Sequence, residues 1–363
     1  MSVDMEQKKR FAWADFMRGW LMFLVILYHS EVYYSDGHTW SWIYEPFFLS
    51  GFFFVSGYLF TSDIFSVSIK SKLLQVLRGI IVPYLFFVTA FSVVKIILMR
   101  VDGTQALIDA LTLRSSWFVI TIGVMQIIYA LALKIRKSIS FLAVATLLMF
   151  IIGYALVLLY RKEPIWLISN PFLNSPELPN RLPLCINLAL VQAPFFFLGM
   201  LYRRYDGRGI KIPMGIVGAM ASIIFYILLY VYIDHNYVGS RMCVVVHVYN
   251  NILLMYLYAV IAIYGLVCIS KVVQMWKPLN YIGKYSVLFY FLNGAVLTIL
   301  SAVLRKIHFL DSNNYFNQIL VAIIAVVVMF PCVWFINRYL PFLRGDKVFF
   351  NKISQKLGLP IRW

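Results

Sequence analysis

Three ionisable residues near the start of the chain are spaced so that a helix would place them along one side. Asp15 and Arg18 are three positions apart, the spacing of an ion pair within one helix turn. Arg18 and His29 are eleven positions apart, which puts them within about 20° of one face and about 16 Å apart along the axis. Arg18, Met22, Val25 and His29 therefore form a predicted stripe, called here the Arg18–His29 stripe.

The chemistry of this stripe is anion binding at one end and proton transfer at the other. A guanidinium binds phosphate in a bidentate manner, and an imidazole accepts a proton near neutral pH. Ionisable groups inside apolar segments are costly and usually functional. The alternative is structural: Arg18 would extend to the membrane interface, and His29 would hydrogen-bond a neighbouring helix.

Composition places the stripe in a membrane protein. Of the 363 residues, 62% are hydrophobic and 13% are charged, whereas soluble domains carry about 25% charged residues. These values exclude a soluble globular enzyme, a disordered chain and a collagen-like fibre. Long unbroken apolar runs also argue against a transmembrane β-barrel.

We therefore expect an all-α fold of about ten transmembrane helices in one integral membrane domain, residues 1–363. Of the 32 Lys and Arg residues, 23 fall in loops or at helix ends on one side, 8 fall on the other, and Lys95 lies within a span. This excess predicts that both termini are cytoplasmic. The first segment is too long for a signal peptide and is expected to be a retained span. The apolar windows lie near 14–35, 43–61, 79–99, 115–134, 139–160, 186–202, 213–233, 247–270, 285–304 and 318–339.

Several other kinds of site are not indicated. The net charge of +17 is explained by topology, and no basic module with interleaved aromatic residues suggests nucleic acid. No HExxH motif, His/Cys cluster or Walker loop is present, so we expect no metal and no nucleoside triphosphate. No CxxC spacing occurs, and buried thiols are expected at Cys185, Cys243, Cys268 and Cys332.

Further short motifs follow in order along nearly the whole chain. They are Pro46-Phe47-Phe48-Leu49-Ser50-Gly51 or Phe54-Val55-Ser56-Gly57-Tyr58, Arg78 with Pro83-Tyr84, Ser116-Trp117-Phe118, and Ile282-Gly283-Lys284-Tyr285-Ser286 with Tyr290. Together with Asp15-x-x-Arg18-Gly19 and His29, they resemble the acyltransferase-3 family. Its members are bacterial inner-membrane proteins that O-acylate sugars of surface glycans.

The resemblance implies a donor, an acceptor and a location. The donor would be cytoplasmic acyl-CoA, most often acetyl-CoA, with no permanently bound cofactor. The acceptor would be a hydroxyl of a surface glycan or a lipid-linked sugar, at the bacterial inner membrane. The phosphates of CoA would favour the cations Arg18, Lys70, Lys72 and Arg78.

His29 would be the catalytic base, or it would be transiently acylated itself; the sequence leaves both open. Asp15 would pair with Arg18, and Asp36 or Glu45 would orient the imidazole. The expected substrate-binding residues are Ser56, Trp117, Tyr285, Ser286, Tyr290 and Asn293. Helix contacts and interfacial aromatic belts explain serines and aromatic residues equally well.

Two departures from the family pattern leave the subfamily and acceptor open. Asn293 stands where the family often has histidine, and Gln75 stands where the first of two paired arginines is expected. The alternative function is a transporter or exporter of a polysaccharide or small solute. That class predicts broken helices in two matching halves, and Pro46, Pro83 and Pro194 show no such symmetry. Acyl chain length, oligomeric state and the side of transfer stay open.

Overall fold

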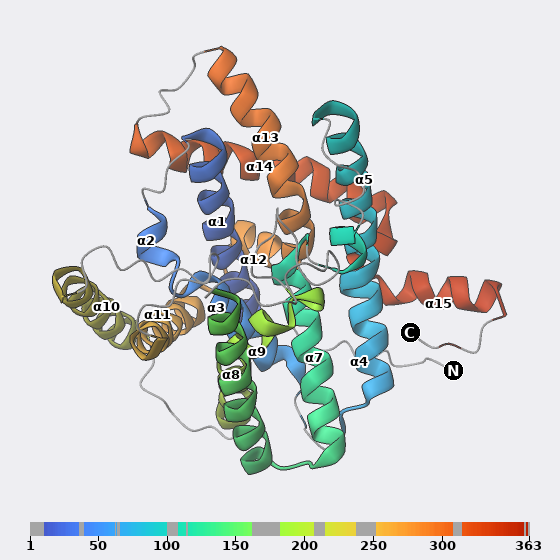
Figure 1. Cartoon of the computed structure of the whole chain (residues 1–363). Helices are drawn as coiled ribbons and strands as arrows, with labels where there is room; N and C mark the ends of the chain where they lie inside the picture. Colours follow the sequence, from blue (N-terminus) through green and yellow to red (C-terminus); the bar gives the residue numbers. More distant parts are fainter. Residues whose placement is uncertain are drawn as a thin grey trace.

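Helices form the regular structure of the described part of the chain (Figure 1). This computed structural model describes residues 11–35, 40–61, 66–99, 108–113, 115–161, 182–206, 215–236, 252–307 and 314–358, with Asp63 and Ile361. The elements are α1 (Ala12–Tyr34), α2 (Ser41–Tyr44), α3 (Phe48–Phe60), α4 (Ile69–Val76), the π-helical turn η2 (Leu77–Ile81), α5 (Val82–Met99), α7 (Trp117–Ile135), α8 (Ile139–Arg161), η4 (Pro183–Cys185), α9 (Ile186–Asp206), α10 (Ile216–Asn236), α11 (Ile252–Val273), α12 (Lys277–Lys284), α13 (Ser286–Lys306), α14 (Tyr315–Tyr339), η5 (Pro341–Arg344) and α15 (Lys347–Lys356).

Within the described residues, eight helical segments are long and apolar enough to cross a membrane. They are Ser41–Phe60, Ile69–Val93, Trp117–Ile135, Ile139–Leu159, Pro183–Asp206, Ile252–Val273, Ser286–Lys306 and Tyr315–Tyr339. α1, which carries several ionisable residues, is not among them, and the apolar part of α10 is shorter. Each of the ten predicted windows nevertheless overlaps helix within the described residues. The prediction of an all-α, multi-pass membrane protein is confirmed.

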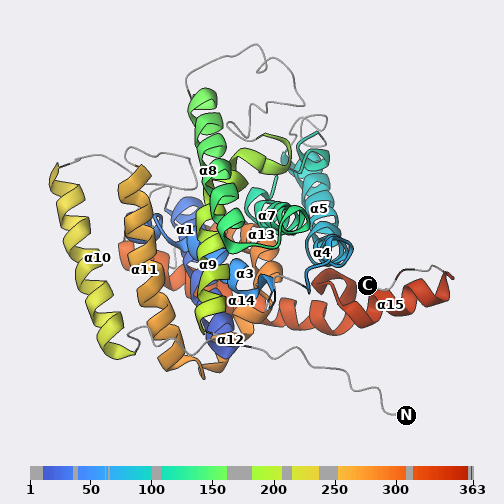
Figure 2. The same ribbon diagram turned by 90° about the horizontal axis from the view of Figure 1, so that it is seen from below.

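The helix that carries the predicted stripe is a core element. α1 packs against α12, α13, α14, α11 and α3, and these helices surround it in both views (Figures 1 and 2). Sixteen of its 23 residues are buried. A helix enclosed in this way is held by protein rather than by lipid, so its polar residues face other helices.

Close backbone contact between α3 and α9 fixes the wall beside α1. A Cβ atom on Gly57 would overlap the carbonyl oxygen of Phe196, and one on Gly199 would overlap that of Phe54. Only glycine permits this approach, which is the usual role of small residues between membrane helices.

Hydrogen bonds hold the C-terminal end of α1 in place. The buried Glu31 accepts the backbone N–H groups of Trp40 (3.1 Å) and Ser41 (3.2 Å) and the hydroxyl of Tyr44 (2.6 Å). Arg305 of α13 donates to the carbonyl oxygen of Tyr34 at 2.8 and 3.1 Å, and so satisfies a carbonyl that the helix end leaves unpaired. The last turn of α1, which begins just after His29, is therefore fixed in place.

Candidate active site

One uninterrupted α-helix covers residues 12–34, so the register of the predicted stripe holds. Arg18 and Asp15 form the predicted ion pair. The Arg18 side chain keeps 25% of its surface exposed, whereas that of Asp15 keeps 10%. The Nε atom of Arg18 is buried and has no hydrogen-bond partner in the described part of the chain. One carboxylate thus orients the guanidinium, and the Nε–H group remains able to donate a further hydrogen bond.

The motif at residues 282–286 packs directly on the turn of α1 that carries Asp15 and Arg18. A Cβ atom on Gly283 of α12 would overlap the carbonyl oxygen of Asp15, and one on Gly19 would overlap the carbonyl oxygen of Leu279. Tyr285 and Ser286, which follow at the α12–α13 junction, are both buried. The structure therefore places these two predicted residues at the Arg18 end of the site.

His29 has a defined ring orientation. Its Nδ1 atom lies 2.7 Å from the carbonyl oxygen of Val25. A carbonyl oxygen can only accept, so Nδ1 carries the proton, and in the neutral ring Nε2 carries the lone pair. Val25 thus takes the role expected of Asp36 or Glu45: Asp36 lies outside the described residues, and Glu45 is buried on the segment after α2. The half-buried imidazole stacks on Tyr33, with ring centroids 6.1 Å apart.

α13 borders this end of α1. A Cβ atom on Gly294 would lie 3.9 Å from the hydroxyl of Tyr33. The preceding residue, Asn293, is buried; its Nδ2 atom donates to the carbonyl of Tyr290 at 2.7 Å. Its Oδ1 atom is buried and has no hydrogen-bond partner among the described residues. One turn of α13 therefore brings an unused acceptor, at the position where the family often has histidine, into the neighbourhood of the His29–Tyr33 pair.

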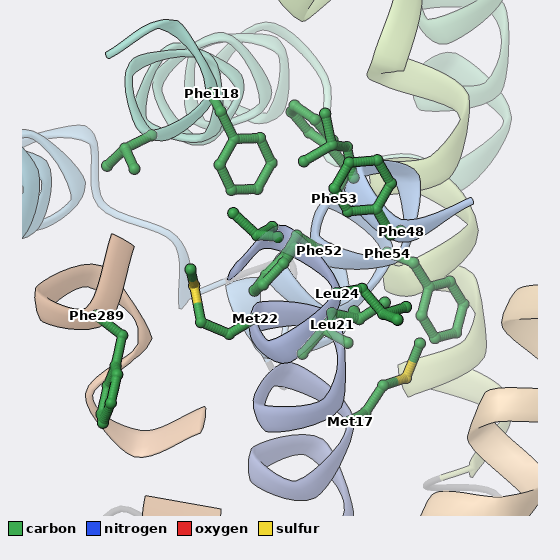
Figure 3. Packing of buried hydrophobic residues seen from close by; sticks show 14 of the residues in the cluster. Met17, Leu21, Met22, Leu24, Phe48, Phe52, Phe53, Phe54, Phe118 and Phe289 are labelled. Carbon is green, nitrogen blue, oxygen red and sulfur yellow. The ribbon is translucent and has the colours of Figure 1, made fainter. Parts of the chain in front are cut away.

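An aromatic contact joins two more predicted residues. Phe118 of α7 contacts Tyr290, with ring centroids 5.7 Å apart, and its neighbour Trp117, at 6.0 Å. Phe118 also packs on Phe52 at 5.1 Å (Figure 3). Trp117 and Tyr290 thus share one aromatic cluster with α3, and the buried Trp117 ring packs within it.

The middle of the stripe is closed by apolar side chains. Met22 and Val25 are 1% and 2% exposed, between a partly exposed Arg18 and a half-buried His29. Figure 3 shows Met22 extending from α1 between Phe289 of α13 and Phe118 of α7. A ligand that connects the two ends must displace these side chains, and methionine is well suited to such repacking.

The other predicted cations occupy different positions. Lys70 is exposed on the first turn of α4. Lys72 is buried; its ammonium donates to the carbonyl of Phe60 and lies 4.2 Å from the centroid of that ring, so it anchors the end of α3. Arg78 lies in η2, and its buried Nη1 atom has no partner in the described residues. η2 packs on α5, α7 and η5, away from the main α1 contacts, so Arg18 and Arg78 belong to separate helix groups.

Ser56 is half-buried on α3, beside the Gly57 contact with α9. Ser50, one and a half turns earlier, is buried and donates to Gln192 of α9 at 3.1 Å. Ser50 therefore lies where α3 meets α9, which favours a packing role for it. Ser56, six residues later, lies about 120° from it around the helix.

A separate apolar cavity of about 440 Å³ lies between α4–η2 and α7. None of the predicted site residues lines it; its walls are aliphatic side chains and Gly123, with Leu113, Leu184 and Ile186 at one end. Ile120 of α7 faces this cavity, two positions after Phe118, which faces the aromatic cluster. A helix turns about 200° in two residues, so α7 separates the cavity from the aromatic cluster.

Comparison with known proteins identifies the family. The model of the family described as an acyltransferase domain, the acyltransferase-3 family, matches residues 11–338. No curated protein and no solved structure gave a significant match. The matched region contains α1 with its stripe and every other element of the candidate site. With this match over about nine-tenths of its length, the chain belongs to the acyltransferase-3 family of multi-pass membrane acyltransferases.

Proposed function

We propose that the protein moves an acyl group, most simply acetyl, from cytoplasmic acyl-CoA to a hydroxyl of a surface glycan or lipid-linked sugar at the bacterial inner membrane. The family match supports acyl transfer in general. The observation that carries the finer proposal is the arrangement of α1: a guanidinium with spare donor capacity and an imidazole with a basic Nε2 on one helix face.

Arg18 would bind the phosphates of the donor. Its ion pair with Asp15 orients the guanidinium, and the close contact of Gly283 in α12 with the backbone of Asp15 and Gly19 holds the same turn of α1 in place. A charge-assisted hydrogen bond from guanidinium to phosphate is among the stronger polar interactions. The pantetheine arm would then run along α1 past Met22 and bring the thioester to His29.

His29 would act on the acceptor. Its Nε2 takes the proton of the sugar hydroxyl as that oxygen attacks the thioester carbonyl carbon. The carbon–sulfur bond breaks, the CoA thiolate leaves, and the imidazolium proton passes to the thiolate to give CoA thiol. In the alternative route, Nε2 attacks the thioester carbonyl carbon first, the carbon–sulfur bond breaks and CoA leaves as the thiolate. The sugar oxygen then attacks the acyl carbon, the bond to Nε2 breaks, and the hydroxyl proton passes to the thiolate. Mass spectrometry of an acid-quenched turnover mixture without acceptor distinguishes the routes, because only the second leaves an acyl group on His29.

A transfer assay tests the function as a whole. Purified protein in proteoliposomes, supplied with labelled acetyl-CoA and a lipid-linked sugar, should release CoA thiol and label the sugar in equal amounts. In a strain that lacks the gene, mass spectrometry should show that the surface glycans have lost the acyl group. Uptake of solute into the vesicles without dependence on acyl-CoA would instead support the transporter alternative.

Arg18→Ala is expected to raise the KM for acyl-CoA by about 10- to 100-fold, because hydrogen bonds to charged groups contribute about 1.5–3 kcal/mol. kcat should change much less, since Arg18 lies about 16 Å along the helix from His29. Arg18→Lys should recover only part of the affinity, because lysine lacks the bidentate fork. Steady-state kinetics over a range of acyl-CoA concentrations measures both effects. The matched control is Arg204→Ala, an exposed arginine at the end of α9; an unchanged KM in Arg18→Ala refutes donor binding there.

The pH profile should show a single essential base. Protonation of Nε2 removes the lone pair, so kcat/KM is expected to fall tenfold per pH unit on the acidic side of the profile. The measurement is kcat/KM for acyl-CoA, obtained from initial rates at saturating acceptor and varied acyl-CoA between pH 5 and 8, in wild type and in His29→Gln. A flat wild-type profile over that range would remove His29 from the role of general base.

A further inference from the structure

The helix that follows the last candidate span projects from the protein. α14 ends at Tyr339, the short turn η5 follows, and α15 begins at Lys347. The main contact of α15 is with η5, and both views show it extending outward from the helical body (Figures 1 and 2). This segment lies beyond the residues 11–338 that match the family model, so the family match assigns it no role.

The start of α15 is fixed on the protein. The carboxylate of Asp346 caps the helix by accepting the backbone N–H of Phe349 at 3.0 Å, and Arg344 pairs with it. Gly345 has a left-handed φ of 67°, and a Cβ atom there would overlap the Cα of Gly79 in η2. Burial raises the pKa of Asp346, but the Phe349 amide and Arg344 lower it by more than burial raises it. The net pKa of Asp346 lies below its ordinary value, so the capping carboxylate is ionised at neutral pH.

α15 is amphipathic. Phe349, Phe350, Ile353 and Leu357 fall within an arc of about 100°. Phe349 and Phe350 are half-buried, whereas Ile353 and Leu357 are 39% and 64% exposed, so the C-terminal half of this apolar face is uncovered. Outside this arc the helix carries Lys347, Val348, Asn351, Lys352, Ser354 and Gln355, and Lys356 lies at the edge of the arc beside Phe349. No acidic residue occurs between Lys347 and Lys356.

We propose that α15 lies in the surface of the bilayer and binds anionic phospholipid. Its apolar arc would enter the boundary between headgroups and acyl chains, while the three lysines contact phosphate-bearing headgroups. The position of α15 next to a candidate span supports lipid as its partner. Only seven residues separate α14 from α15, so α15 stays near the membrane surface at a high effective concentration. The charge pattern disfavours a second copy of α15, since two lysine-bearing helices without acidic residues repel each other.

Hydrogen exchange tests this proposal on the full-length protein in nanodiscs. One set of discs is zwitterionic, and the other contains about one-third phosphatidylglycerol. The backbone amides of residues 347–356 are expected to exchange at least tenfold more slowly in the anionic discs, and added salt should reduce the difference by screening. The triple variant K347Q/K352Q/K356Q should abolish the lipid dependence, and K347R/K352R/K356R should retain it, because a lysine near an anionic surface contributes about fivefold in binding.

A second variant pair tests the apolar arc. I353S/L357S should lose protection in anionic discs, whereas N351S/Q355S, on the opposite side, should keep it. Equal exchange in both lipid compositions would overturn the proposal. So would protection that appears only in discs with two copies of the protein, which would assign the face to self-association. None of these readouts depends on acyl transfer, so the result stands apart from the proposed function.

Discussion

His29→Ala is expected to abolish acyl transfer while the folded protein remains in the membrane. The variant loses the lone pair of Nε2, and positioned general bases contribute typically 10²- to 10⁴-fold to rate. The structural cost is small, because among the described residues the ring hydrogen-bonds the carbonyl of Val25 in its own helix, and such a bond contributes about 0.5–1.5 kcal/mol. Initial rates of CoA thiol release, at wild-type protein levels, give the measurement.

Two companion measurements separate catalysis from folding and binding. His29→Gln keeps a polar side chain without a base and should be as inactive as His29→Ala. Binding of labelled acetyl-CoA should persist in both variants, since the proposed phosphate site is at Arg18, about 16 Å along the helix. Wild-type turnover in either variant would end the catalytic role of His29, and lost donor binding would show that His29 shapes the donor site instead.

Gly283→Ala is expected to lower both activity and thermal stability strongly. The new methyl group would overlap the carbonyl oxygen of Asp15 and approach the amide nitrogen of Gly19 to 2.8 Å. Both are backbone atoms, so α12 and α1 must separate, and overpacking typically costs about 1–3 kcal/mol, occasionally more. Because the displaced turn carries Arg18, the KM for acyl-CoA should rise as well. The measurements are the Tm in detergent and steady-state kinetics.

The matched control is Gly79→Ala in the η2 turn. A Cβ atom on Gly79 would meet no atom within 4 Å, so the substitution should leave the Tm within a few degrees of wild type. If Gly283→Ala behaved like this control, the close contact between α1 and α12 would not hold the charged turn.

The sequence predicted the helices and the stripe because both depend on local spacing. Long apolar windows define spans wherever they occur, and the register from Arg18 to His29 follows from helical geometry alone. The sequence did not indicate which group would hold the His29 ring. Asp36 or Glu45 was expected to orient the imidazole, and the structure shows the carbonyl of Val25, one turn back in the same helix, at Nδ1.

Contacts between distant segments could not be read from the sequence. The Gly283 contact with Asp15 depends on how α12 docks on α1, and nothing local to either segment encodes it. Lys72 was expected among the donor-binding cations, yet it anchors the end of α3 on Phe60. Glu31 was overlooked, although a carboxylate in an apolar run was itself a signal; it binds the chain around α2.

The most direct test is a structure of the protein bound to a non-hydrolysable acyl-CoA thioether in a lipid nanodisc. A phosphate of the analogue should accept hydrogen bonds from the Arg18 guanidinium, and the acyl carbon should lie near Nε2 of His29, with Met22 displaced. An analogue bound on another set of helices, or an Arg18 or His29 side chain turned toward lipid, would contradict the account.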